Sequence, residues 1–198
     1  TRTIRRCRCS GVWRGSSATL SLWPAQPQPL TLTHDGAGKP WATLVSRAAL
    51  PLKSPFSSGY RITRTVSPVE GDGGQWKRGD IYRVRLAMDA QSDMTWVVVE
   101  DPIPAGATIL GSGLGGDSGL ATRGEKREGW VWPAFEERGF EAFRAYYEFV
   151  PKGAWTVEYT VRMNNAGTFQ LPPTRVEAMY APEMFGEVPN TKVTIGNR

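Results

Sequence analysis

Few residues of this chain could do chemistry, and a Gly-Asp-Ser-Gly sequence at residues 116–119 is the first candidate. A serine in such a turn acts as a nucleophile when a histidine takes its proton. The chain holds one histidine, His34, which lies in a distant segment beside Asp35. Nothing around Ser118 indicates a strained turn or an oxyanion hole. We therefore expect a polar loop there and not a catalytic serine.

The glycines and cysteines offer no firmer site. Gly111, Gly113 and Gly116 fit a G-x-G-x-x-G pattern, but that pattern binds pyrophosphate only where it opens a helix, and further glycines and charges follow here. Cys7 and Cys9 are separated by one residue, which is too close for an unstrained disulfide. A metal site needs more ligands than the neighbouring sequence supplies. We predict neither a metal nor a cofactor.

Four carboxylates could provide the acid and base of a glycoside hydrolase: Glu136, Glu137, Glu141 and Glu148. Arg138 and Arg144 lie among them at spacings typical of solvated ion pairs. Carboxylates are far more often surface residues than catalysts. We therefore predict that the chain is not an enzyme.

Aromatic residues support an alternative, a module that binds carbohydrate or protein. Aromatic rings at a spacing of two on a strand are more often core than ligand platform. Trp130 and Trp132 flank a loop and stay ambiguous, and two coplanar exposed rings would favour a sugar. The residues in question are Trp130, Trp132, Tyr146, Tyr147 and Trp155.

The charge distribution argues against a nucleic-acid partner. The 198-residue chain has a net charge of +5. Residues 1–50 hold seven basic residues and one acidic residue, whereas residues 51–198 hold 17 and 18. The excess lies in an arginine-rich arm, and the body is close to neutral. No apolar run approaches the roughly 18 residues of a membrane span, and no export signal is visible.

Alternation of apolar and polar residues predicts about nine short strands, hence an all-β, antiparallel β-sandwich. The clearest strand covers residues 80–89, with Tyr82, Val84, Leu86 and Met88 on one face. Residues 94–100 form an apolar run suited to a central strand. We expect an arm over residues 1–28, a β-hairpin segment over 29–56 with a linker at 51–59, and the sandwich over 57–198.

The run from Leu171 to Gly186 differs from the rest. A double proline opens it, and Val176, Ala178 and Tyr180 then share one face of an expected strand. We expect that strand to end at Pro182 and a loop to carry Met184 and Phe185. Apolar side chains in an exposed loop indicate a partner surface.

These motifs resemble the end of a bacterial alpha-2-macroglobulin, a very large periplasmic protein that traps proteases. The resemblance covers roughly residues 29–195. It is carried by residues 79–84, 101–106, 132–136, 149–153, 166–169 and 171–186. It implies a final macroglobulin domain of Ig type over residues 57–198. Residues 29–56 would then be strands of the CUB-like domain that follows a helical thioester domain.

The resemblance also implies a function. Relatives capture proteases through a cysteine–glutamine thioester in a C-x-E-Q motif, which this chain lacks. The final domain packs on the thioester domain and shields the bond, with Met179 and Tyr180 matching the shielding residues. Met184 and Phe185 extend that interface. The implied partners are the thioester domain of the same polypeptide and the trapped proteases. The implied location is the periplasm. Many relatives look as if a lipid anchors them to the inner membrane.

Overall fold

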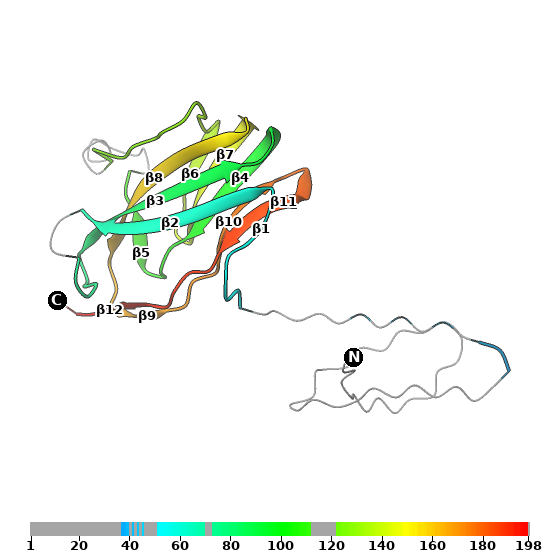
Figure 1. Cartoon of the computed structure of the whole chain (residues 1–198). Helices are drawn as coiled ribbons and strands as arrows, with labels where there is room; N and C mark the ends of the chain where they lie inside the picture. The colour runs from blue at the N-terminus through cyan, green and yellow to red at the C-terminus, as the bar shows by residue number, and fades with distance from the viewer. Residues whose placement is uncertain are drawn as a thin grey trace. The chain divides into compact units, whose positions relative to one another are not determined.

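The computed structural model describes residues 37–39, 41, 43, 45, 51–69, 73–111 and 122–197. The chain divides into two compact units, Thr1–Ala49 and Leu50–Arg198. All twelve described strands belong to the second unit (Figure 1). The expected arm lies outside the described residues, as does most of the hairpin expected before residue 49.

Two antiparallel sheets form the second unit, as the alternation predicts. Within the described residues there is no helix. In spatial order the six-stranded sheet contains β1 (Phe56–Ser58), β11 (Ala181–Val188), β10 (Thr174–Ala178), β4 (Met94–Pro102), β7 (Ala142–Val150) and β6 (Phe135–Arg138). The four-stranded sheet contains β2 (Tyr60–Pro68), β3 (Ile81–Ala90), β8 (Gly153–Met163) and β5 (Ala107–Ile109). A third, two-stranded sheet pairs β9 (Gly167–Phe169) with β12 (Val193–Ile195).

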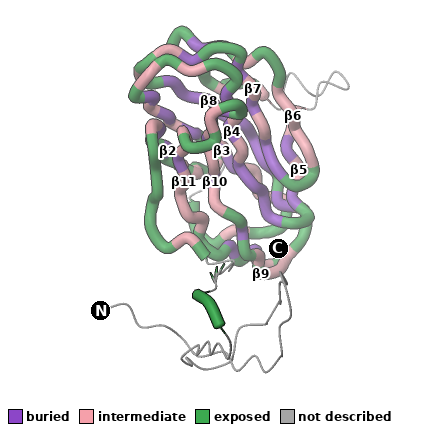
Figure 2. The backbone as a smooth tube through the Cα atoms, turned by 90° about the vertical axis from the view of Figure 1, so that its right-hand side faces the viewer, coloured by how far each residue is buried: buried purple, intermediate pink, exposed green. Residues whose placement is uncertain are grey.

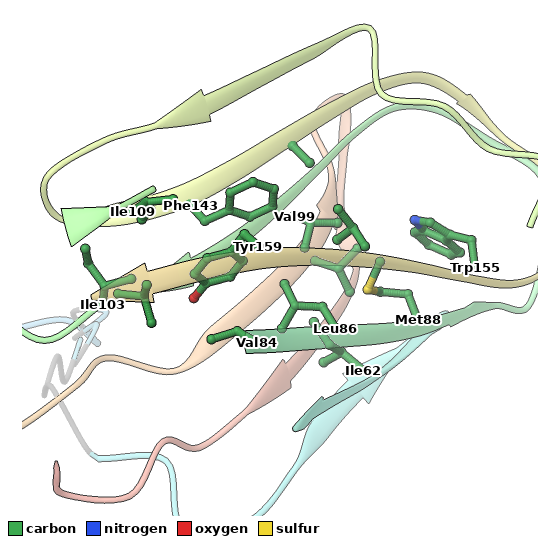
Figure 3. Packing of buried hydrophobic residues seen from close by; sticks show 14 of the residues in the cluster. Ile62, Val84, Leu86, Met88, Val99, Ile103, Ile109, Phe143, Trp155 and Tyr159 are labelled. Atoms are coloured by element: carbon green, nitrogen blue, oxygen red, sulfur yellow. The ribbon is translucent and has the colours of Figure 1, made fainter. Parts of the chain in front are cut away.

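The core lies between the two larger sheets, and the predicted inward faces fill it. Tyr82, Val84, Leu86 and Met88 are all buried on β3. Figure 3 shows Val84 and Leu86 packed toward side chains of the opposite sheet. The ring of Phe143 on β7 stacks on that of Tyr159 on β8, with centroids 4.6 Å apart. Figure 2 shows the buried stretches along the central strands. The Ig-like sandwich is confirmed.

Three strands differ from the sequence-based expectation. β1 lies inside the expected linker, β6 was not expected, and β11 runs where the strand was expected to end in a loop. Each of the three pairs with a neighbouring strand: β1 with β11, β11 also with β10, and β6 with β7. Local composition could not reveal them because cross-strand pairing stabilises them.

Candidate functional site

The tip of the β10–β11 hairpin carries two neighbouring exposed apolar side chains. β10 ends at Ala178, which pairs with Ala181, so Met179 and Tyr180 form the turn. We expected Tyr180 to lie on a strand and to share one face of it with Val176 and Ala178. Instead, the side chains of Met179 and Tyr180 are 47% and 79% exposed, while Val176 and Ala178 are buried. The turn therefore presents both side chains to solvent.

Trp96 on β4 braces this turn. Its carbonyl oxygen accepts a 2.7 Å hydrogen bond from the Met179 N–H. Its indole meets the Tyr180 ring edge-on, with centroids 6.4 Å apart and the planes at 89°. Such edge-to-face pairs are stabilising. The sequence analysis missed Trp96 because a large aromatic inside an apolar run equally suits a buried strand.

The backbone at Trp96 is strained, with φ at 54°. Among the described residues other than glycine, no second one has a positive φ. A left-handed conformation costs roughly 1–2 kcal/mol for a residue with a Cβ. Met94 and Val97, on either side of Trp96, both pack into the core, whereas Thr95 and Trp96 are exposed. The strained residue thus switches the inward face of β4 and turns the Trp96 indole outward.

The expected loop carrying Met184 and Phe185 is wrong, because both residues lie on β11. The register jumps between the pairs Glu177–Phe185 and Ala178–Ala181, so residues 182–184 bulge from the strand. Pro182 cannot donate to the sheet and suits such a bulge. Met184 turns inward over Gly59, where an added Cβ would lie 2.2 Å from the Met184 Cε. Phe185 packs on Phe56, with ring centroids 5.2 Å apart.

A buried carboxylate ties β10 to the opposite sheet. Asp101 on β4 has no exposed surface and accepts hydrogen bonds from Arg64, Tyr159 and Thr174. The Arg64 Nε lies 2.9 Å from both Asp101 oxygens. Burial, followed by the charge of Asp101, raises the pKa of Tyr159 well above its usual value. Burial alone would lower the pKa of Arg64, but the charge and hydrogen bonds of Asp101 raise it overall. This network fixes the strand that leads to the turn.

The expected ion pairs of β6 and β7 are present for three of the four carboxylates. Glu136 pairs with Arg138, and Glu137 and Glu141 both pair with Arg144. The Glu148 side chain has no ion pair or hydrogen bond among the described residues. No group of three or more potential metal ligands occurs within the residues that the structure describes.

The aromatic candidates separate into two groups. Tyr147 and Trp155 are buried in the core, and Tyr146 is half-buried against Phe135. Trp130 and Trp132 are 97% and 70% exposed. Ser118, His34, Cys7 and Cys9 lie outside the described residues.

Chemically, the turn suits binding. Met179, Tyr180 and Trp96 bring an apolar surface with a phenolic hydroxyl, and none of them carries a carboxylate, imidazole or thiol. An aromatic ring with a polar end and a flexible thioether can fill a partner surface at low entropic cost. No helix among the described residues is long and apolar enough to cross a membrane.

Comparison with known proteins agrees with this architecture. The family described as Bacterial Alpha-2-macroglobulin MG10 domain matches residues 59–183. A curated relative, the alpha-2-macroglobulin homolog of Nostoc sp., is 25% identical over 193 residues, which cover 90% of this chain and 10% of the relative. The native conformation of Escherichia coli alpha-2-macroglobulin superposes with a TM-score of 0.59 at 21% identity, covering 74% of this chain and 10% of that one.

A further structure, Salmonella alpha-2-macroglobulin reacted with methylamine, gives a TM-score of 0.56 at 22% identity and covers 72% of this chain and 9% of that one. These structural likenesses establish the fold. The chain thus spans about a tenth of the length of the relatives that it matches. Because the family match covers well over half of the sequence, the chain belongs to the bacterial alpha-2-macroglobulin MG10 domain family.

Proposed function

We propose that the chain is a non-catalytic C-terminal module of a broad-spectrum protease inhibitor of the bacterial alpha-2-macroglobulin type. In this proposal the sandwich over residues 57–198 packs on the thioester domain of the parent protein and shields its thioester. Residues 29–56 are strands of the CUB-like domain between them, and residues 1–28 are an arm. The partners are that thioester domain and the proteases that the parent traps.

The observation that carries the proposal is the exposed turn at Met179 and Tyr180. Its ring and thioether project from a hairpin held by Trp96 and by the Asp101 network. Exposed apolar groups on a rigid support indicate a surface that another domain covers. Met184 and Phe185 support the interface indirectly. They pack against Gly59 and Phe56 and so hold β11, the strand that follows the turn.

Shielding follows from the chemistry of a thioester. Water or a small amine that reaches the carbonyl cleaves the bond, so a closely packed apolar cover prolongs its life. Proteolysis elsewhere in the parent then shifts a two-state structure, lifts the cover and frees the thioester for capture. In this proposal the parent works in the periplasm, where it can meet foreign proteases. Nucleic acid has no part in it, since the charge of residues 51–198 is close to neutral.

Tyr180→Ala in the full-length parent tests the proposal. We expect faster release of thiol with methylamine than in the unchanged parent, because the amine gains access to the bond. Phe140→Ala is the matched control, since Phe140 is an exposed aromatic away from the turn. Unchanged release in Tyr180→Ala, with the fold intact by circular dichroism, would exclude Tyr180 as a shield.

The second candidate is an Ig-like module for a carbohydrate or a protein. Its support is the exposure of Trp130 and Trp132. A glycan-array signal that Trp132→Ala abolishes would favour the carbohydrate version.

A further inference from the structure

A cleft of about 620 Å³ lies on the six-stranded sheet, away from the β10–β11 turn in sequence. Three exposed aromatic rings, those of Trp130, Trp132 and Phe149, contribute to its lining. Glu148 is the one ionisable residue in that lining. The remaining lining residues are Val131, Ala134 and Pro151.

The tryptophans stand on a segment that is fixed at both ends. Before them, the Glu128 carbonyl accepts a 2.9 Å hydrogen bond from the Thr156 N–H of β8. After them, the Ala134 N–H donates a 2.7 Å hydrogen bond to the Tyr146 carbonyl of β7. Between the two, Val131 is buried. The exposed rings are therefore held by the fold, and an ordered apolar surface of this kind is typical of a binding site.

The strand beneath exposes the other half of the cleft. On β7, Tyr147 and Val150 are buried, whereas Glu148 and Phe149 between them are exposed. Thr95 and Val97 of β4 pair with Phe149 and Tyr147. In both strands the alternation of buried and exposed residues is therefore interrupted at the same position along the sheet. This is the position at which Trp96 has a left-handed backbone. The switch turns the Phe149 ring and the Glu148 carboxylate out of the sandwich together.

The charge of the cleft is uncompensated. No cation lies among the lining residues, and Glu148 lacks an ion pair within the described part of the chain. At the rim, the Arg127 guanidinium already lies 5.9 Å from the centre of the Trp132 ring and pairs with Glu136. A cation between an aromatic face and a carboxylate is thus an arrangement that this part of the molecule already contains.

We propose that the cleft binds a lysine or arginine side chain of a partner protein. The cationic head lies beside the Glu148 carboxylate and over the Trp130 face, where the charge and the ring quadrupole both attract it. The aliphatic stem packs on Phe149 and Pro151. A carboxylate is the one charged group in the lining, which favours a cationic ligand over a neutral sugar. This inference does not depend on the shielding role of the turn.

Titration of the whole chain with tetralysine, followed by the tryptophan indole N–H signals in NMR spectra, tests the proposal. We expect the Trp130 and Trp132 signals to shift with tetralysine but not with the same peptide acetylated on its side chains. Loss of one signal in Trp130→Ala and of another in Trp132→Ala assigns them. Glu148→Gln should weaken binding by about tenfold or more, because it removes the charge but keeps the shape.

Two matched variants should bind tetralysine as the unchanged chain does. Glu183→Gln removes an exposed carboxylate on β11, and Phe140→Ala removes an exposed ring outside the cleft. Tyr180→Ala should also bind normally, which separates this inference from the proposed shielding. Equal weakening by Glu183→Gln, an unchanged affinity in Glu148→Gln, or a response to chitohexaose in place of tetralysine would overturn the proposal.

Discussion

At the scale of single residues, Tyr60 combines complete burial with a hydroxyl that has no hydrogen-bond partner among the residues that the structure describes. An unpaired buried polar group costs roughly 1–3 kcal/mol. Burial also raises the pKa of Tyr60 to about 12. Both features weaken the fold, one at every pH and one only in alkali.

Tyr60→Phe should therefore leave the free energy of unfolding unchanged or raise it at neutral pH. Because the folded-state pKa is raised, the unfolded chain loses the Tyr60 proton first as the pH rises above 10. The free energy of unfolding of the unchanged protein then falls between pH 10 and about 12. The Tyr60→Phe variant lacks this contribution and should lose less stability over that range. Urea unfolding at pH 7.5 and pH 11 measures both effects. A clear destabilisation at pH 7.5 would mean that the hydroxyl has a partner.

Asp101 is the opposite case, a buried carboxylate whose oxygen atoms accept hydrogen bonds. Asp101→Asn would turn an amide group toward Arg64, Tyr159 and Thr174 and leave the Arg64 charge uncompensated. We expect a loss of about 3–5 kcal/mol in the free energy of unfolding. Glu177→Gln, which weakens a partly exposed pair with Arg175, should cost under about 1 kcal/mol. Similar losses in chemical denaturation of both variants would contradict this account.

At the scale of elements, sequence periodicity predicted the strand whose faces alternate most clearly, β3. It failed where neighbours decide the structure. β1 contains two serines and pairs with β11, and the bulge at residues 182–184 concealed the continuation of β11 beyond Pro182. The face switch at Trp96 was equally hidden, because it depends on a backbone conformation that the residue type disfavours.

Trp96→Gly tests two opposing effects of Trp96: its strained backbone destabilises the fold, and its ring stabilises the β10–β11 turn. Glycine adopts a positive φ freely, so the variant should keep most of its stability despite the lost ring. The turn should loosen, with faster amide hydrogen exchange at Met179, because the Tyr180 ring loses its edge-on contact. Trp96→Ala is the control, since it loses the ring but keeps the strain and should be less stable. Equal exchange at Met179 in all three proteins would show that Trp96 does not brace the turn.

At the scale of the whole molecule, the family resemblance located the region of the site, and the structure corrected its geometry. Met179 and Tyr180 were expected on a strand and form its turn, whereas Met184 and Phe185 were expected in a loop and lie on a strand. A chain register that depends on a three-residue bulge cannot be derived from alternation alone.

The compact unit Leu50–Arg198 contains all the described strands, so a protein of residues 50–198 should fold by itself. We expect one cooperative thermal transition with nearly the same midpoint as the 198-residue chain, since no described strand is lost. Differential scanning calorimetry of both proteins measures this. A change of 1 kcal/mol in the free energy of unfolding shifts the midpoint of a domain of this size by less than about 8 °C. A midpoint lowered by more than that would show that residues 1–49 stabilise the sandwich.

The six-stranded sheet ends on its shortest members, the three-residue β1 and the four-residue β6. A partner that extended the sheet by strand addition would find very few free main-chain groups at either border. Polymerisation through these borders is disfavoured for the same reason. A partner of the six-stranded sheet must then be recognised by side chains, and substituting single residues can change that partner without altering the strand pairing.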